Sequence, residues 1–410
     1  MSKSVPLWLV VVFVVIALLP SVYFLGVQQG EKAATTASTA AASKNTARQA
    51  SVPLQTAAHA VPAHPAGAPV IKPFSHFRVG NRNVKSILAD GDVLWVGTSG
   101  GVIRYDIKSD DYRLFDVKNK SLLSNGVFHL RKLGDRLMVG TYGGGLSVFQ
   151  PETEQWRNYN IPQGLADQFV YDTKVMPNGD LWIATWSGVN LIPGGDMDAA
   201  DSWQTYNKKN TDGGLPNDWV YGVEADSRGA LWFATENGVA RYFDGKWQNW
   251  QHEHGLGADY EQVKNDLKFS SDPAKVSKHH ARQKTEQGFS RVKTAYNPNY
   301  VVALLVTSDD TVWAGTWGGG LAHFDGKTWR NYTSADGLPS NHVFTLYEDP
   351  QKRFWIGTSH GLARLENEKF VVYRRQQGLF ADNVFSLTTD EQGYLWAGSF
   401  GGVARLDLSK

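Results

Sequence analysis

Seven copies of one short motif run through this 410-residue chain and constrain its fold more than any other feature. The motif reads apolar–Trp–apolar, then Gly or Ala, then Thr or Ser, and it occupies residues 94–98, 137–141, 181–185, 231–235, 312–316, 354–358 and 395–399, with Met in place of Trp in the second copy. Successive copies begin 43, 44, 50, 81, 42 and 41 residues apart. A period of about 40–45 residues with several short strands is typical of β-propeller blades, which pack around an axis because no single blade can bury its own faces.

Each motif lies inside a predicted four-stranded antiparallel meander. A Val opens one strand 11 or 12 residues before each Trp position, and turn residues such as Pro177-Asn178-Gly179 separate that strand from the motif. A third strand follows the motif, and a fourth contains two aromatic residues three positions apart, as in Trp329 and Tyr332. The sequence therefore predicts an all-β fold, a seven-bladed propeller over residues 72–410.

The last blade reaches only its third strand before Lys410, but a candidate for the fourth lies at the other end of the domain. Phe74 and Phe77 carry the aromatic spacing of the other fourth strands. We expect strand 72–79 to pair with residues 402–407, because such closure removes the open edges that the first and last blades would otherwise expose.

The N-terminus carries a long apolar run. Residues 6–27 are almost wholly apolar, and about 20 residues in a helix span a bilayer core. We expect a transmembrane signal-anchor helix there, with residues 1–5 in the cytoplasm and the propeller outside; the alternative is a cleaved signal peptide. Residues 28–71, rich in Ala, Thr, Ser and Pro, are predicted to be a flexible linker. The expected location is the inner membrane of a bacterium, single-pass, with the propeller in the periplasm.

Composition narrows the chemistry. The net charge is +1, which gives no electrostatic reason to expect nucleic acid. The chain contains no Cys, which excludes disulfides, thiolate metal sites and Cys nucleophiles. His252, His254, His279 and His280 have no fixed ligand spacing, so we predict no metal and no cofactor.

The motif copies, together with residues 337–343 (Gly-Leu-Pro-Ser-Asn-His-Val) and related Gly-Leu pairs at 164, 214 and 378, resemble the two-component-regulator propeller repeats. This resemblance covers about residues 74–410 and implies a seven-bladed, extracytoplasmic sensor-type domain. The 410 residues include no kinase, receiver or DNA-binding segment, so kinase activity is not implied. A ligand- or partner-sensing role is implied instead, with a separate sensor kinase or a membrane complex as a possible partner.

The predicted site lies at one end of the propeller axis, where the turns between second and third strands meet the crossings between blades; we call this end the mouth. Large or polar side chains occupy its variable positions and are not required by blade packing. The candidate ligand- or partner-binding residues are Tyr142, Trp186, Trp219, Glu236, Tyr300, Trp317, His342, His360 and Phe400. The extra length between the fourth and fifth motifs places a predicted helical insertion, residues 257–298, over the same mouth as a lid or flank.

Three function classes stay open on this pattern. We expect a non-enzymatic module that binds a ligand or protein partner in sensing or signalling. The alternatives are a scaffold or assembly factor that uses the outer rim, and a lyase or hydrolase that uses Glu236, His342, His360 or Asp382. For the binding module, changing Trp186 and Trp317 together to Ala should abolish partner binding without altering the melting temperature.

Overall fold

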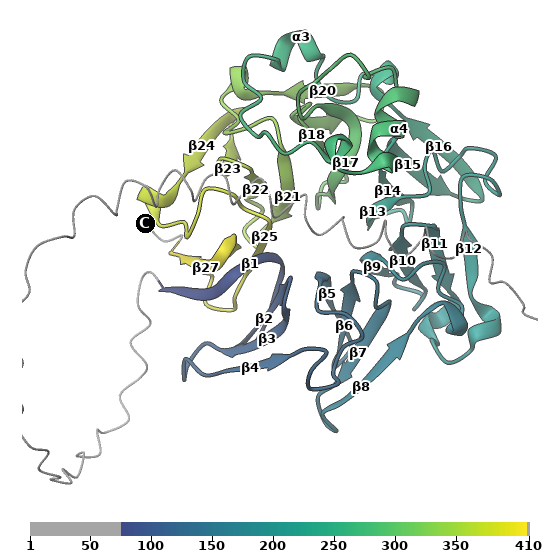
Figure 1. Cartoon of the computed structure of the whole chain (residues 1–410), viewed down its shortest axis with the longest axis vertical. Helices are drawn as coiled ribbons and strands as arrows, with labels where there is room; N and C mark the ends of the chain where they lie inside the picture. The colour runs from purple at the N-terminus through teal and green to yellow at the C-terminus, as the bar shows by residue number, and fades with distance from the viewer. Residues whose placement is uncertain (1–74, 408–410) are drawn as a thin grey trace, which may run out of the picture.

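The computed structural model describes residues 75–407, which form an all-β ring of seven blades (Figure 1). Five blades are separate four-stranded antiparallel sheets. Blade 2 contains β5 (Val127–Leu133), β6 (Arg136–Thr141), β7 (Leu146–Gln150) and β8 (Gln155–Tyr159). Blade 3 contains β9 (Val170–Val175), β10 (Leu181–Thr185), β11 (Gly188–Ile192) and β12 (Gln204–Tyr206). Blade 4 contains β13 (Val220–Ala225), β14 (Leu231–Thr235), β15 (Gly238–Phe243) and β16 (Lys246–Trp250).

Blades 5 and 6 repeat this order. Blade 5 contains β17 (Asn297–Val306), β18 (Val312–Trp317), β19 (Leu321–Phe324) and β20 (Trp329–Tyr332). Blade 6 contains β21 (Val343–Glu348), β22 (Phe354–Thr358), β23 (Gly361–Glu366) and β24 (Lys369–Tyr373). Short 3₁₀ helices lie in the connections: η1 (Ile161–Gln163), η2 (Pro193–Gly195), η3 (Ala200–Ser202), η4 (His252–His254), η5 (Pro273–Lys275), η6 (Ser334–Asp336) and η7 (Arg375–Gln377).

One long strand, β1 (Ser75–Asp90), joins the last blade to the first. Its second half is the inner strand of blade 1, followed by β2 (Val93–Thr98), β3 (Gly101–Asp106) and β4 (Tyr112–Phe115). Its first half completes blade 7, which otherwise contains β25 (Ser386–Thr389), β26 (Leu395–Gly398) and β27 (Phe400–Leu406). Ser75 lies opposite Arg405 and Arg78 lies opposite Gly402, so the predicted closure is confirmed for residues 75–78. Residues 72–74 lie outside the described part.

The Thr of the motif closes the turn between the second and third strands. In six blades its hydroxyl donates to the carbonyl of a Gly three or four residues later, at 2.8–2.9 Å. In blade 3 that residue, Gly188, has a left-handed φ of 100°, and a Cβ there would lie 2.1 Å from the Tyr206 carbonyl oxygen. The Gly is therefore needed both for the backbone conformation and for the close approach of the fourth strand.

The Trp and the small residue of the motif fix the packing between blades. Trp95 of blade 1 is buried in one cluster with Val127, Leu137 and Phe149 of blade 2. A Cβ at Gly97 would lie 2.6 Å from the Val127 side chain, so only a very small residue leaves room for the next inner strand. Because the same contacts recur from blade to blade, the motif specifies a closed ring.

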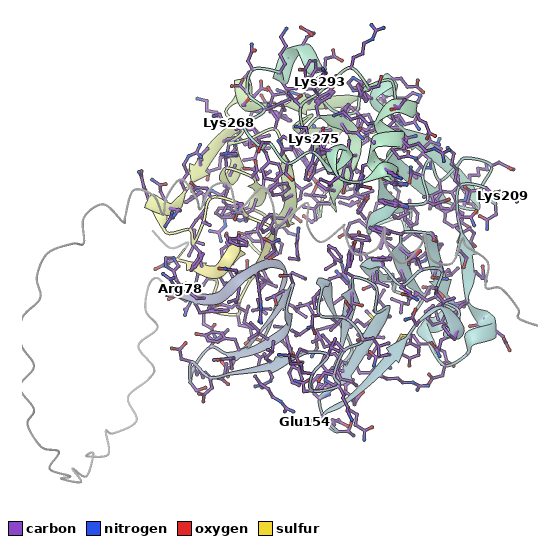
Figure 2. The ribbon with its side chains drawn as sticks, in the orientation of Figure 1. Arg78, Glu154, Lys209, Lys268, Lys275 and Lys293 are labelled. Carbon is purple, nitrogen blue, oxygen red and sulfur yellow. The ribbon has the colours of Figure 1, made fainter. Side chains whose placement is uncertain are left out.

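The segment between blades 4 and 5 contains two short α-helices, α3 (Tyr260–Val263) and α4 (Lys278–Glu286). Lys268, Lys275 and Lys293 all belong to this insertion, whereas Glu154 and Lys209 lie on the outer rim (Figure 2). A buried ion pair between Lys284 Nζ and Asp272 Oδ2, 2.7 Å long, ties α4 to the chain before it. Lys284 also donates to the Thr294 carbonyl at 2.8 Å, so the insertion has a polar core of its own.

No helix within residues 75–407 is long and apolar enough to cross a membrane. The predicted membrane span at 6–27 and the predicted linker at 28–71 lie outside the described residues.

Candidate functional site

Figure 1 shows the inner strands of the blades arranged around the centre of the ring. Residues from all seven inner strands line a cavity of about 910 Å³. Its lining includes the residue that directly follows the opening Val of each inner strand: Lys85, Phe128, Tyr171, Tyr221, Val302, Phe344 and Phe385. Each of these Val side chains is buried, so the next residue along the strand faces the axis. The site predicted from the sequence, at the turns and crossings of the mouth, does not include this ring, although strand alternation from the same Val could have identified it.

The cavity wall is divided by polarity. Five side chains from blades 1 to 3, which we call the polar arc, are Lys85, Ser86, His129, Arg131 and Asp172. Five from blades 5 to 7, which we call the apolar arc, are Val302, Leu304, Phe344, Leu346 and Leu387. A ligand in this cavity therefore meets charged groups only on blades 1 to 3, beside aromatic residues such as Phe128 and Tyr171, and mostly aliphatic or aromatic groups on blades 5 to 7.

The centre of the polar arc is a hydrogen-bonded cluster around Asp172. Its Oδ1 lies 3.1 Å from His129 Nδ1 and 3.6 Å from Arg131 Nη2, and its Oδ2 accepts from the Val223 backbone N–H at 2.9 Å. Burial lowers the pKa of the His129 imidazole well below its usual value, with the Arg131 charge as a further cause. Burial likewise raises the pKa of the Asp172 carboxyl. His129 is therefore neutral at physiological pH and hydrogen-bonds Thr173 Oγ1 through Nε2 at 2.9 Å.

The residues that follow the opening Val of each inner strand form what we call the channel ring, and Lys85 is its cationic member. Its Nζ lies 4.6 Å from the centre of the Phe385 ring, and burial lowers the pKa of its ammonium from 10.5 to about 7. A lysine in this setting is held close to the boundary between its charged and neutral forms.

The mouth contains a continuous stack of aromatic rings on blades 3 and 4. Phe169 stacks on Trp186 with centroids 4.1 Å apart, and Trp186 stacks on Trp219 at 4.2 Å with parallel planes. Trp219 then stacks on His279 of α4 at 3.3 Å. Two predicted site residues, Trp186 and Trp219, are thus brought together, and the insertion extends their stack.

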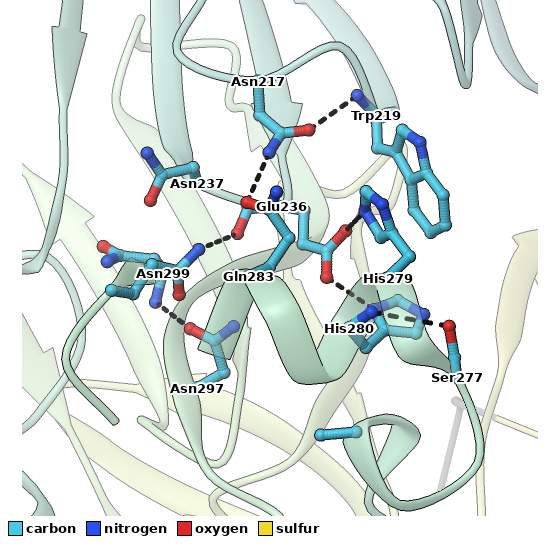
Figure 3. A network of polar contacts seen from close by, with 12 residues as sticks. Asn217, Trp219, Glu236, Asn237, Ser277, His279, His280, Gln283, Asn297 and Asn299 are labelled. Atoms are coloured by element: carbon cyan, nitrogen blue, oxygen red, sulfur yellow. Dashed lines mark hydrogen bonds and ion pairs between the residues drawn. The ribbon is translucent and has the colours of Figure 1, made fainter. Parts of the chain in front are cut away.

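Glu236 holds the insertion to blade 4 (Figure 3). Its Oε2 lies 2.8 Å from His279 Nε2, and its Oε1 lies 2.5 Å from His280 Nδ1. Burial disfavours the charged carboxylate, but the contacts with His280 and His279 outweigh that effect, so the pKa of Glu236 is lowered. Gln283 supports the same attachment through a 3.0 Å bond from Asn217 Nδ2 to its Oε1.

The insertion also covers the mouth beside blade 5. Phe269 lies edge-on to Trp317, with ring centroids 5.7 Å apart, and it contacts His342 at 5.2 Å. His342 Nε2 lies 2.7 Å from the Ala295 carbonyl oxygen, and burial lowers the pKa of its imidazole to about 4. Tyr300 stacks on Trp317 at 5.5 Å.

The nine predicted site residues fall into four groups. Tyr142, Trp186 and Tyr300 line the cavity. The expectation that the others are exposed at the mouth is wrong for Glu236, Trp317 and His342, whose exposed fractions are 0, 1 and 0%, because the insertion packs over them. Trp219 lies half-buried against His279. His360 and Phe400, both half-buried, lie apart from the cavity lining: His360 Nδ1 bonds Ser359 Oγ at 2.9 Å, and the Phe400 backbone N–H donates to Asn383. Within residues 75–407, no group of three or more His, Cys, Asp and Glu side chains could hold a metal ion.

The repeats match a known family. The model of the two component regulator propeller matches residues 214–237 and 337–360. These two segments are similar to the repeats of the two component regulator propeller family. Both matched segments run from the Gly-Leu-Pro crossing through the inner strand to the turn after the motif, which is the stretch that builds the mouth and the channel wall. A comparison with curated proteins gave no match.

Solved structures of similar fold come from several kinds of protein. The extracellular domain of BT4673 from B. thetaiotaomicron is 16% identical with a TM-score of 0.57, over 82% of this chain and 40% of that one. An inactive virginiamycin B lyase from Staphylococcus aureus, solved with quinupristin, is 13% identical with a TM-score of 0.56, over 82% and 99%. YCF48 bound to D1 peptide is 10% identical with a TM-score of 0.52, over 82% and 97%. At these identities the likeness shows the fold alone, and the chain spans less than half of the BT4673 structure.

Proposed function

We propose that this propeller is an extracytoplasmic binding module in sensing or signalling, and that its ligand enters the central channel at the mouth. The observation that supports this is the 910 Å³ cavity with its polar and apolar arcs. Ligand sites are typically concavities of about 300–1,000 Å³ with mostly apolar walls and a few placed polar groups. The channel has this size and this distribution of groups.

The covered mouth supports a small ligand rather than a large protein surface. Trp317 and His342, two of the anchors expected for a partner, are buried under the insertion. His280 and Pro273 of the insertion themselves line the cavity. The insertion is thus a flank of the ligand site, and it narrows the entrance on the side of blades 4 and 5.

Location outside the cytoplasm is part of the proposal. The apolar run at 6–27 supports a single membrane anchor, with the propeller on the periplasmic side of a bacterial inner membrane. The propeller of similar fold in BT4673 is an extracellular domain, in a protein assigned to one component and hybrid two component systems. We propose that the signal passes to a separate membrane partner, such as a sensor kinase or a membrane complex.

The enzyme alternative has less support. One structure of similar fold is a lyase, but the four candidate groups on this chain, Glu236, His342, His360 and Asp382, are all outside the cavity lining. Glu236 is occupied by two imidazoles and His342 by a backbone carbonyl. Binding therefore accounts for the geometry better than turnover at these residues.

Site-specific photo-crosslinking in cells tests the proposal against the scaffold alternative. A photoreactive p-benzoylphenylalanine replaces Phe128, which lines the channel, or Tyr112, which is 74% exposed at the outer strand β4. We expect a small-molecule adduct at position 128, identified by mass spectrometry, and none at position 112. Protein adducts at position 112 with none at 128 would support a scaffold that uses the rim and would contradict the proposed function.

A further inference from the structure

The charges that line the channel are unequal. Its described lining contains three permanently or partly cationic side chains, Arg82, Lys85 and Arg131, against one carboxylate, Asp172. Asp172 already contacts Arg131 and His129. The other two cations of the lining, Arg82 and Lys85, lie on the same strand, β1, three positions apart.

Both side chains line the cavity. Lys85 is the blade 1 member of the ring that follows the opening Val. Arg82 lies over the turn between β2 and β3, where a Cβ at Gly100 would be 2.2 Å from its Nε. The missing side chain at Gly100 leaves room for the guanidinium at the rim of the channel. Cationic side chains that line a concave, partly desolvated cavity favour anions over neutral molecules.

The far wall presents the opposite chemistry. The apolar arc places Val302, Leu304, Phe344 and Leu346 across blades 5 and 6, and Phe344 stacks on Phe385 of blade 7 at 5.3 Å. Gly222 of β13 lies between the two arcs, since a Cβ there would be 3.7 Å from Leu304 Cβ and 3.8 Å from Asp172 Oδ2. A larger side chain at position 222 would therefore occupy the space between the polar and apolar arcs.

We infer that the channel selects a small amphipathic anion, an aromatic or aliphatic carboxylate or sulfonate, whose acidic group lies beside Lys85 and Arg82 and whose apolar body packs on blades 5 to 7. This inference rests on the proposed function and names the ligand class for the same site. The depressed pKa of Lys85 agrees with it, because an anion beside the ammonium would restore the charged form that burial disfavours.

A matched pair of probes tests the inference: 1-naphthaleneacetate and its neutral amide, titrated into the full-length chain by calorimetry. We expect the acid to bind one-to-one and more tightly than the amide. Lys85→Met keeps the length of the side chain and removes the charge, so it should weaken acid binding about tenfold, the effect of losing one charge-assisted hydrogen bond. Affinity for the amide should change less than about twofold. Lys118→Met, at an exposed lysine outside the channel, is the control and should change neither.

Two further variants keep the result interpretable. Arg82→Gln changes a half-exposed residue and should weaken binding of the acid but not of the amide. This variant tests the anion preference even if Lys85→Met lowers the melting temperature. Gly222→Leu fills the middle of the channel and should abolish binding of both probes. Equal affinities for acid and amide, both lost in Gly222→Leu, would overturn the anion preference and leave the channel as the ligand site. Acid binding that survives Gly222→Leu would place the probe outside the channel and overturn both claims.

Discussion

Ring closure by β1 has a measurable energetic consequence. A chain beginning at residue 81 lacks residues 75–80, whereas a chain beginning at residue 70 retains them. Phe77 stacks on Tyr105 at 4.5 Å and contacts Trp396, and Val79 is 7% exposed in the same cluster. Burial of a Phe or Val side chain contributes roughly 1.5–3 kcal/mol, so losing both should cost about 4 kcal/mol. The backbone pairing with β27 is lost in addition, which leaves that strand as an open edge.

Urea unfolding of the two chains measures this difference. Typical domains are stable by about 5–15 kcal/mol, so a loss of about 4 kcal/mol should lower the unfolding midpoint strongly. As a point test within the longer chain, Phe77→Ala should cost about 2 kcal/mol, because Phe77 is only partly buried. Its control, Tyr112→Ala at a residue 74% exposed, should cost less than about 0.5 kcal/mol. Equal midpoints for the chains beginning at 70 and 81 would refute the closure argument.

Four further outcomes are expected. Trp317→Ala should lower the free energy of unfolding by about 3–5 kcal/mol in chemical denaturation, because Trp317 is only 1% exposed. The expectation that the double Trp186 and Trp317 variant keeps its melting temperature therefore does not hold. A loss below about 1 kcal/mol would contradict the place of Trp317 in the core. Glu236→Gln should release α4, seen as faster amide exchange over residues 278–286. The lowered pKa of the Glu236 carboxyl stabilises the folded state above the unfolded pKa of 4.5, and this stability is lost as the pH falls through the folded pKa, so acid should also speed exchange. Exchange that neither the variant nor low pH affects would refute the attachment. Binding of 1-naphthaleneacetate should weaken from pH 6 to pH 9 as Lys85, with a pKa of about 7, loses its proton, and Lys85→Met should abolish this dependence. The other titratable or charged groups of the lining are Arg82, His129, Arg131, Tyr142, Tyr171, Asp172, Tyr221, His280 and Tyr300. Protease added to spheroplasts should remove the propeller and leave a membrane stub, whereas full protection would place the domain in the cytoplasm.

The fold could be read from the sequence because its determinants are local and repeated. The Trp and the Thr of the motif are each present in six of the seven copies, and they make the same kind of contact from one blade to the next, so the repeats support one another as evidence for the fold. The closing strand was recognisable for a similar reason, since Phe77 keeps the aromatic spacing of the other fourth strands.

The site was only partly predictable because its cover does not repeat. Phe269 meets His342, and Glu236 meets His279 and His280, through contacts between segments more than 40 positions apart that no period relates. From the sequence we expected an open mouth with Trp317 and His342 as exposed anchors. In the structure both are buried and support the insertion. The channel ring, by contrast, could have been predicted from strand alternation, because Lys85 and Phe128 each follow a buried Val.

Protection of a single introduced thiol tests the channel as a ligand site most directly. The chain has no Cys, so Thr345→Cys, on the channel wall, would carry its only thiol, and Thr153→Cys on the exposed outer surface is the matched control. The rate of alkylation by iodoacetamide is measured with and without saturating 1-naphthaleneacetate. The account predicts slower alkylation at position 345 and an unchanged rate at position 153. An unchanged rate at position 345 with the bound acid present would contradict it.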